Sequence, residues 1–488
     1  MKKIIFLFVA FFCLFLHSNV VAKIENQSPR IISVKLLQDK KSSKVIIKFS
    51  DVFKTKPIAM TTLETVTFDL DYVYKKDAKH KREKKNESNH QFKISSKGFL
   101  KKISWFTNGK KTYFEIKREY YTPVKFINQN ESKTLIVEFP RTYFDIESTE
   151  LKPGITKHLI RTVKRNSPVT AHALEIDLKR KNVSIKVGLP DSKKIKAKDT
   201  LLNIVKNSMA FAGINANYFD VKVGNPLGTL ITDGTWLVGP VYDRVAVGFS
   251  KDNMVFIDQI MLSGNATIYR GFIKKPFAMF VIDGLNVPFH LYKKIGLYTV
   301  NWDEKLEVPK QKVAAIVKHN CINKIVDGSI EISDDGYVIV SNKDYILNYF
   351  KKKDCLKIEW QTSPNWSEVH EAISGGPYLI MDGKVYVDEL AQNFKFARKD
   401  TYAPRSAVGI NAEGNLFLIA VDGRRSGYSV GVTLKELAEL LKKLNLKEAI
   451  NLDGGGSTTL VASGEIINRL SERHERKISN ALLIFYKD

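Results

Sequence analysis

Between residues 31 and 139 the chain contains short runs of β-forming residues and no helical pattern. The runs alternate or cluster branched and aromatic side chains, and they lie at 31–36, 44–49, 65–70, 113–116 and 134–139. Polar turns separate them. Strands this short bury their apolar side chains only when they pair into sheets that pack on one another. Residues 23–150 are therefore expected to form a small all-β domain, a β-sandwich.

From about residue 151 glycines become frequent and fall at turn positions. The segments 226–234 and 376–383 resemble each other, because each runs from an apolar stretch into an Asp-Gly pair. An Asp-Gly pair after an apolar stretch is a strong signal for a β-hairpin. Both segments are therefore expected to form hairpins.

One clear helix is expected in this second part of the chain. Leucines and an alanine share one face of residues 434–444, and Thr433 is a natural N-cap. Expected strands at 416–421 and 449–452 flank the helix, which predicts a parallel crossover. The predicted fold class is α+β, with a mixed-sheet C-terminal domain over residues 151–488 that follows the small all-β domain.

The first 22 residues have the pattern of a secretory signal peptide. Lys2 and Lys3 precede an apolar run over 4–16, and Val20-Val21-Ala22 supplies small residues at the cleavage position. Cleavage after Ala22 predicts export to the periplasm, the cell envelope or the medium. The alternative is an uncleaved membrane anchor. After cleavage no stable membrane insertion is expected, because no other apolar run is long enough to span a bilayer.

The chain is strongly basic, with a formal net charge of +25. An exported protein of this charge is attracted to anionic surfaces, and anionic cell-envelope polymers are the expected partner. A lysine-rich genome produces the same charge without any functional reason. Nucleic acid is not an expected partner, because the sequence contains no recognised nucleic-acid-binding motif.

Two cysteines, Cys321 and Cys355, remain after the leader is removed. In an oxidising compartment they can form a disulfide, which would add about 3–4 kcal/mol of stability. Two free buried thiols are the alternative, because spacing alone does not establish geometry. The histidines lack the spacing of zinc ligands, so a zinc site is not expected. No metal ligand and no cofactor is predicted, and the need for a divalent cation stays open.

The motif with the most chemical content is Asp453-Gly454-Gly455-Gly456-Ser457. A carboxylate follows an expected buried strand, and three glycines let the backbone fold tightly. Exposed amides in such a turn can bind an anion, and Ser457 adds a hydroxyl. The alternative is a tight turn with no ligand. A serine-hydrolase site is not expected, because the motif is not a nucleophile elbow.

Three further clusters carry polar groups at strand ends. Asn215 lies in the Asn-rich segment 213–220, paired glycines occur in 373–377, and Arg405 precedes the segment 421–424, which contains Asp422. Arg405 can grip a phosphate with two parallel hydrogen bonds, although most arginines are structural or lie on the surface.

In their order and in their residues these clusters resemble the motifs of the phosphodiester glycosidase family. The resemblance covers residues 165–488 and includes Gly-Gly-Pro at 375–377, Pro-Arg-Ser-Ala-Val-Gly-Ile at 404–410, Leu-Asp-Gly-Gly-Gly-Ser at 452–457 and the closing Arg476-Lys-Ile-Ser-Asn-Ala. Ser406 replaces a commoner threonine, and Ala216-Asn217 replace commoner paired glycines. The first domain more weakly resembles AMIN domains, which target exported bacterial enzymes to the envelope.

The resemblance implies an exported hydrolase that cleaves a sugar-1-phosphodiester, such as one of N-acetylglucosamine, at the anomeric carbon. Its substrate would be a phosphate-bearing glycan or a small sugar phosphodiester. The expected catalytic residues are Asp453, Asp422 and Asn215. The expected substrate-binding residues are Arg405, Ser374, Gly375, Gly376, Gly454, Gly455, Gly456, Ser457 and Arg476.

The chemistry of the reaction agrees with this assignment. The leaving group is a phosphomonoester with a pKa of about 6, so it needs less help from a general acid than a sugar alkoxide does. A carboxylate beside the anomeric carbon either attacks or activates water, and Asp453 is the first choice for this role. One rival is a binder of anionic wall glycan that does not cut. Another is a metal-dependent phosphodiesterase with Asp453, Asp422 and Asn215 as oxygen ligands.

Overall fold

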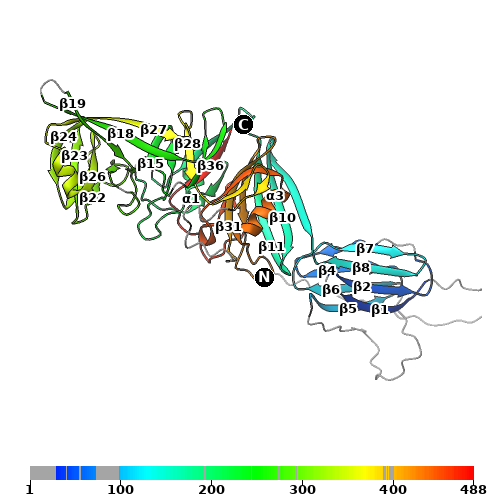
Figure 1. Ribbon diagram of the computed structural model, residues 1–488. Coiled ribbons are helices and arrows are strands. Elements are labelled where there is room, and N and C mark those ends of the chain that lie inside the picture. Colours follow the sequence, from blue (N-terminus) through cyan, green and yellow to red (C-terminus); the bar gives the residue numbers. More distant parts are fainter. Residues whose placement is uncertain are drawn as a thin grey trace, which may run out of the picture.

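The computed structural model has three β-rich bodies arranged in a row (Figure 1). The expected leader, residues 1–22, lies outside the described residues. The structure describes residues 29–39, 41–53, 57–72, 98–191, 194–242, 244–271, 275–292, 294–387, 392, 394 and 401–487.

The N-terminal body contains two four-stranded antiparallel sheets. The first, in spatial order, is β1 (Ile31–Gln38), β2 (Ser42–Phe49), β8 (Thr134–Pro140) and β7 (Lys125–Gln129). The second is β3 (Met60–Thr61), β4 (Thr65–Leu70), β6 (Lys111–Arg118) and β5 (Leu100–Asn108). Val45 and Ile47 of the first sheet share a core with Val66 and Ile116 of the second, so the two sheets pack face to face.

The chain passes into the middle body between Pro140 and Phe144. Strand β9 (Phe144–Lys152) pairs with β10 (Ile155–Lys164) over nearly its whole length and belongs to the next sheet. The expected division at residue 150 therefore falls inside a strand of the middle body.

An eight-stranded sheet forms the main layer of the middle body. Its order is β30 (Lys384–Val385), β29 (Tyr378–Met381), β33 (Leu446–Asn451), β31 (Arg405–Asn411), β32 (Leu416–Val421), β11 (Ser167–Ile176), β10 and β9. Strand β31 is antiparallel to both β32 and β33. Strands β32 and β33 therefore run parallel to each other, as the expected crossover requires, but β31 lies between them.

Helix α3 (Leu434–Lys443) connects β32 to β33 and confirms the expected helix. The Thr433 hydroxyl accepts a hydrogen bond from the Glu436 amide, and the Glu436 carboxylate accepts one from the Thr433 amide, forming a capping box. The apolar face, with Leu437, Ala438 and Leu441 fully buried, shares a core with the eight-stranded sheet. The helix thus forms the connection from β32 to β33, the strand that precedes Asp453.

Two five-stranded sheets complete the middle body together with helix α1 (Leu201–Asn207). One contains β12 (Val183–Gly188), β36 (Ala481–Tyr486), β13 (Ala212–Asn215), β34 (Leu460–Ala462) and β35 (Glu465–Ile466). The other contains β15 (Thr235–Val238), β14 (Leu230–Thr232), β28 (Glu371–Ser374), β16 (Val245–Phe249) and β17 (Val255–Gln259).

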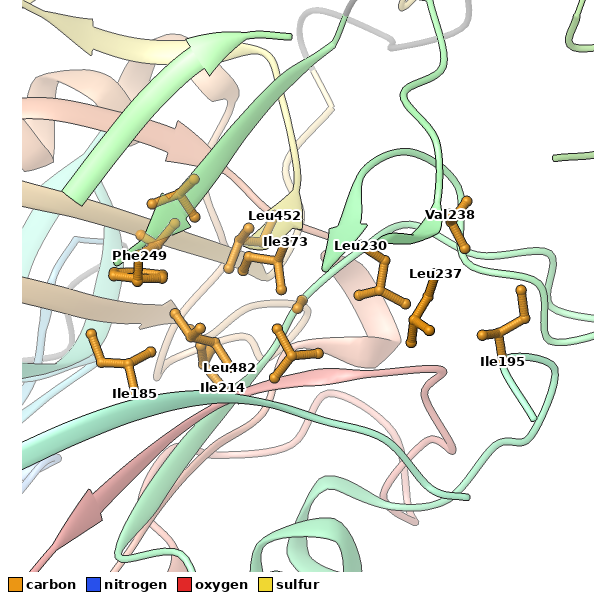
Figure 2. Close-up of a cluster of buried hydrophobic side chains, with 14 of the residues drawn as sticks. Ile185, Ile195, Ile214, Leu230, Leu237, Val238, Phe249, Ile373, Leu452 and Leu482 are labelled. Carbon is orange, nitrogen blue, oxygen red and sulfur yellow. The ribbon is translucent and has the colours of Figure 1, made fainter. Parts of the chain in front are cut away.

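The apolar core between these sheets reaches the strand ends that carry the polar motifs. Ile214, Ile373 and Leu452 are fully buried in one cluster (Figure 2). Each directly precedes an expected site residue, namely Asn215, Ser374 and Asp453. Burial of the apolar neighbour therefore fixes where each polar residue leaves its strand.

A third body is inserted between β17 and β28, and sequence reasoning did not separate it from its surroundings. Its main sheet is β19 (Lys275–Ile282), β18 (Met261–Arg270), β27 (Cys355–Ser363), β24 (Cys321–Val326), β23 (Lys312–Lys318), β26 (Gly336–Asn342), β21 (Gly296–Tyr298) and β20 (Gly284–Leu285). Strands β22 (Lys305–Glu307) and β25 (Ser329–Glu331) form a small ribbon, and helix α2 (Lys343–Tyr349) follows β26. Cys321 and Cys355 face each other across β24 and β27 and form a disulfide.

The α+β fold class is confirmed, with strands far outnumbering helices among the described residues. Both Asp-Gly hairpins form as expected, at Asp233-Gly234 between β14 and β15 and at Asp382-Gly383 between β29 and β30. All four turn residues have positive φ, which matches the turn type that joins two-residue hairpins. None of the described helices combines the length and apolar character needed to cross a bilayer.

Candidate active site

Asn215, at the end of β13, holds the segment that contains Asp453. Its Nδ2 donates a hydrogen bond to the main-chain carbonyl of Asp453. Its Oδ1 accepts hydrogen bonds from Ser406 Oγ at 2.7 Å and from the Thr459 amide at 3.1 Å. Because the side chain is fully buried and bonded at both ends, the geometry gives Asn215 a positioning role.

Asp453 follows β33 and keeps part of its surface accessible. Burial of the carboxyl group raises its pKa to about 6, against the opposing effects of the Ser457 hydroxyl, the Gly454 amide and the Arg476 charge. The Gly454 amide donates to Asp453 Oδ1 at 3.0 Å. A carboxylate with this pKa is ionised at neutral pH and is a stronger base than an ordinary aspartate.

The glycine loop after Asp453 is folded tightly, but most of its amides are used within the protein. The Gly454 amide bonds to the Asp453 carboxylate, and the Gly455 amide donates to the Pro404 carbonyl at 2.8 Å. The Ser457 amide donates to the Gly454 carbonyl at 3.2 Å. The expectation that three consecutive amides point at a ligand is therefore wrong for Gly454 and Gly455, because local and cross-strand acceptors take them.

Two arginines flank the glycine loop instead. A Cβ on Gly456 would lie 2.2 Å from Arg476 Nη2, and a Cβ on Gly455 would lie 3.3 Å from Arg424 Nη2. Both guanidinium groups approach Glu472, by a direct hydrogen bond from Arg476 and at 3.9 Å from Arg424. The glycines thus let two cations lie against the backbone beside Asp453. Sequence reasoning named Arg476 but left out Arg424.

Asp422 is the centre of a buried hydrogen-bond network. Its side chain is fully buried. Oδ2 lies 3.0 Å from His172 Nε2 and accepts from Tyr428 Oη at 2.8 Å. Oδ1 accepts from Asn468 Nδ2 at 3.2 Å and from the Arg469 amide at 2.9 Å. Both oxygens are occupied, so the geometry gives Asp422 a positioning role and does not favour it as the attacking carboxylate.

The Arg405 guanidinium contacts main-chain carbonyls. Nε donates to Val432 O at 3.2 Å, and Nη2 donates to Thr401 O at 3.0 Å. Its charge still acts at the site, because it lowers the pKa of Tyr218 against the stronger effect of burial. Arg405 therefore contributes a positive field, while the fork geometry expected for a phosphate is partly used by the backbone.

The segment from Ser374 to Gly376 joins strands and does not present side chains to a ligand. Ser374 is buried, and its hydroxyl donates to Val245 O at 3.3 Å. A Cβ on Gly375 would lie 2.2 Å from the carbonyl oxygen of Asn451. The Gly376 amide donates to that carbonyl at 2.6 Å. These residues hold the end of β28 close to the end of β33, the strand that precedes the Asp453 loop.

Tyr218 and Asn451 are part of the site and were missed by sequence reasoning. Asn451 Nδ2 donates to Tyr218 Oη at 2.6 Å, and Tyr218 Oη donates to Gly376 O at 3.1 Å. Burial and the Asp453 charge raise the pKa of Tyr218, so its hydroxyl stays protonated. Tyr218 lies in the Asn-rich segment 213–220, which was the available signal.

Two of the three oxygen ligands expected for a metal-dependent phosphodiesterase, Asp422 and Asn215, are already used by donors within the protein. The side-chain oxygens of Asp422 and Asn215 already accept hydrogen bonds from protein donors, as described above. Within the described ranges a different set has potential ligand atoms within 4.8 Å of one another, namely Asp233, His370 and Glu371. Lys186 Nζ lies 3.1 Å from Asp233 Oδ1 and neutralises part of that charge.

The C-terminal part of the chain is similar to known proteins. The family model for phosphodiester glycosidases matches residues 311–485. N-acetylglucosamine-1-phosphodiester alpha-N-acetylglucosaminidase from Bos taurus is 29% identical over 167 residues, which are 31% of this chain and 30% of that protein. The protein of the same description from Homo sapiens is 27% identical over 167 residues, covering 31% of each chain. The chain thus spans about 30% of the length of these curated relatives.

Among solved structures, a hypothetical protein from Synechocystis has the same fold over most of this chain. Its TM-score is 0.65 at 18% sequence identity, with 95% of this chain and 81% of that chain covered. At this identity the likeness shows the fold alone.

The family match includes Arg405, Asp422, Asp453 and Arg476 but not Asn215. The C-terminal part of this chain, residues 311–485, is therefore similar to the phosphodiester glycosidase family.

Proposed function

We propose that this protein hydrolyses a sugar-1-phosphodiester at the anomeric carbon, with Asp453 as the reacting carboxylate. The observation that carries the proposal is the environment of Asp453. A partly accessible carboxylate with a pKa of about 6 lies beside Arg476, at the end of a strand inside the family match. Such a carboxylate can attack the anomeric carbon or take a proton from water.

The cations beside Asp453 suit a phosphodiester leaving group. Arg476 and Arg424 lie against the glycine loop and share one carboxylate, Glu472, so one positive charge remains for a substrate phosphate. In the reaction the bond between the anomeric carbon and the phosphate oxygen breaks, and a phosphomonoester leaves with that electron pair. Water supplies the hydroxyl of the sugar product. The arginines stabilise the charge that develops on the departing phosphate.

The cellular role belongs to the same proposal. The leader-like segment at 1–22 and the charge of +25 support export and attraction to phosphate-bearing polymers of the cell envelope. The relatives from Bos taurus and Homo sapiens are named for an N-acetylglucosamine-1-phosphodiester, which makes that linkage the first to test. The N-terminal sandwich would then hold the enzyme near its polymer.

A panel of sugar-1-phosphodiesters tests the proposal. The purified chain is expected to release a reducing sugar and a phosphomonoester in equal amounts, and Asp453→Asn is expected to slow the release of both at least ~100-fold. Asp382→Asn is the matched control, because Asp382 lies in the hairpin turn between β29 and β30. Binding of wall glycan without any release from the panel would contradict the proposal and favour a binding protein.

A further inference from the structure

Arg244 lies in a cluster of aromatic rings near the candidate active site. Its guanidinium carbon is 4.0 Å from the ring centre of Phe394, 5.4 Å from that of Tyr242 and 5.7 Å from that of Tyr218. Arg244 directly precedes β16, and part of its surface remains accessible. The rings therefore hold a cation at a place that a ligand can reach.

This cation has no anionic partner in the described part of the chain. No carboxylate there forms an ion pair with Arg244, and its buried Nε donates no hydrogen bond. Burial lowers its pKa, and only the neighbouring tyrosines oppose this effect. Arg476 and Arg424 differ in this respect, because both approach Glu472.

Leaving a buried guanidinium without an acceptor is costly. Stacking on aromatic rings recovers part of this cost for a desolvated cation, but it satisfies none of the N–H donors. A partly buried charge of this kind is stabilised most by a hydrogen-bonded anion. Since the described protein supplies none, a bound oxyanion would complete the site.

Tyr218 places Arg244 relative to the reacting carboxylate. The charges of Asp453, Arg405 and Arg244 all affect the pKa of Tyr218. Arg476 is the arginine whose charge acts on Asp453 itself. The site therefore has one cationic position next to Asp453 and a second at Arg244, whose guanidinium carbon is 5.7 Å from the centre of the Tyr218 ring.

We propose that Arg244 binds a second oxyanion of the substrate, beyond the phosphate at the scissile bond. The preferred substrate class is then a sugar phosphodiester that carries a further phosphate or carboxylate close to the linkage. This inference rests on the proposed function for its scissile phosphodiester. Arg244 sets specificity and does not take part in bond cleavage.

Three substrates with the same sugar test the inference on the full chain. One is a methyl phosphodiester with a single charge, the second is linked through pyrophosphate, and the third carries a carboxylate on the alcohol side of the phosphodiester. The protein is expected to prefer one of the doubly charged substrates in kcat/KM. Arg244→Gln is expected to raise KM for that substrate at least 10-fold, with kcat changed less than 3-fold and the methyl diester unaffected.

The two doubly charged substrates distinguish the sources of the oxyanion. If Arg244 matters only for the pyrophosphate, the second group is a phosphate, and if only for the carboxylate, it is a carboxylate. Arg180→Gln removes a surface cation that pairs with Asp177 and is expected to change nothing. Arg244→Lys keeps the charge without the planar fork and is expected to raise KM by less. It replaces the Gln variant if that variant unfolds.

Direct binding separates failure of this inference from failure of the proposed function. Calorimetry with inorganic pyrophosphate is expected to show binding that Arg244→Gln weakens at least 10-fold. If no sugar phosphodiester is cleaved but this difference persists, the subsite stands and the proposed activity fails. If the substrates are cleaved and Arg244→Gln affects the methyl diester and the doubly charged ones equally, or affects none, the subsite is refuted while the activity stands.

Discussion

The Asn215 side chain links Ser406 to the backbone of Asp453 through two hydrogen bonds. Ser406 Oγ donates to Asn215 Oδ1, and Asn215 Nδ2 donates to the Asp453 carbonyl. Strands β13 and β31 thereby fix the position at which Asp453 follows β33. The candidate site is thus supported by the ends of these strands, while Asp453 and the glycines lie on the loop that follows β33.

Asp453→Asn is expected to lower kcat at least ~100-fold, which is the lower end of what an acid–base group supplies. The amide keeps the size of the side chain and can still accept from the Gly454 amide, so KM is expected to change only a few-fold. Steady-state kinetics with Asp382→Asn as control give the measurement. Near-normal turnover in a folded Asp453→Asn protein would exclude this residue as the reacting carboxylate.

Activity is expected to fall on the acidic side of about pH 6. Asp453 must be ionised to act, and burial raises its pKa to about 6. Below that value kcat/KM should drop about tenfold for each pH unit, because the protonated fraction increases by that factor. A pH profile with a diester that does not titrate in this range is the test. A flat profile between pH 4 and 7 would assign the reacting group to an ordinary carboxylate.

Asp453→Asn is also expected to stabilise the fold at neutral pH. The folded-state pKa is raised above the unfolded value of 3.8, so stability is lost as the pH rises from 3.8 through about 6, and the full cost remains above that. At a pH below the unfolded value of 3.8 the carboxyl is protonated in both states and the cost disappears. The variant should therefore have a higher Tm than wild type at pH 7.5 and an equal Tm near pH 3.5. An equal Tm at both pH values would mean that the carboxylate is well solvated.

Asp422→Asn is expected to lose stability and activity together. An amide nitrogen cannot accept the hydrogen bonds that an Asp422 oxygen receives, so the buried donors at one of the two oxygens lose their acceptor. The cost should be about 2–4 kcal/mol. Chemical denaturation and kinetics on the same samples distinguish this outcome from that of Asp453→Asn. A stable, inactive Asp422→Asn protein would instead assign a direct catalytic role to Asp422.

A chain shortened to begin at residue 142 is expected to fold and to retain activity on small soluble substrates. A chain that begins at residue 153 lacks β9, which pairs with β10 from Phe144 to Lys152. It should have a lower Tm, because the edge of the eight-stranded sheet loses a partner strand. Both shortened chains should bind isolated cell envelope more weakly than the full chain. Equal Tm values would show that β9 is dispensable, and equal envelope binding would remove the targeting role of the sandwich.

Local signals in the sequence were sufficient to predict one helix and two hairpins. The Thr433 cap, the Leu434–Lys443 helix and the two Asp-Gly hairpins depend on residues close in sequence, and all form as expected. The position of Asp453 after a buried strand was also correct. These features follow from periodicity and turn chemistry, which a single sequence contains.

The features that the sequence did not predict depend on contacts between residues far apart in the chain. The Gly455 amide meets the carbonyl of Pro404, and Asp422 meets His172 of β11, and neither pairing leaves a sequence signal. The Arg244 cluster likewise combines Tyr218 with Phe394, from separate segments. The inserted sheet was hidden because its strands have the same turn-rich pattern as those around them. Only the folded chain shows which polar groups are already satisfied.

Hydrolysis in oxygen-18 water tests the central claim most directly. The active chain is incubated with a sugar-1-phosphodiester, and both products are analysed by mass spectrometry. Cleavage at the anomeric carbon predicts one heavy oxygen in the sugar and none in the phosphomonoester. Heavy oxygen in the phosphomonoester would mean that the P–O bond breaks, and it would contradict the assignment of Asp453 to the anomeric carbon.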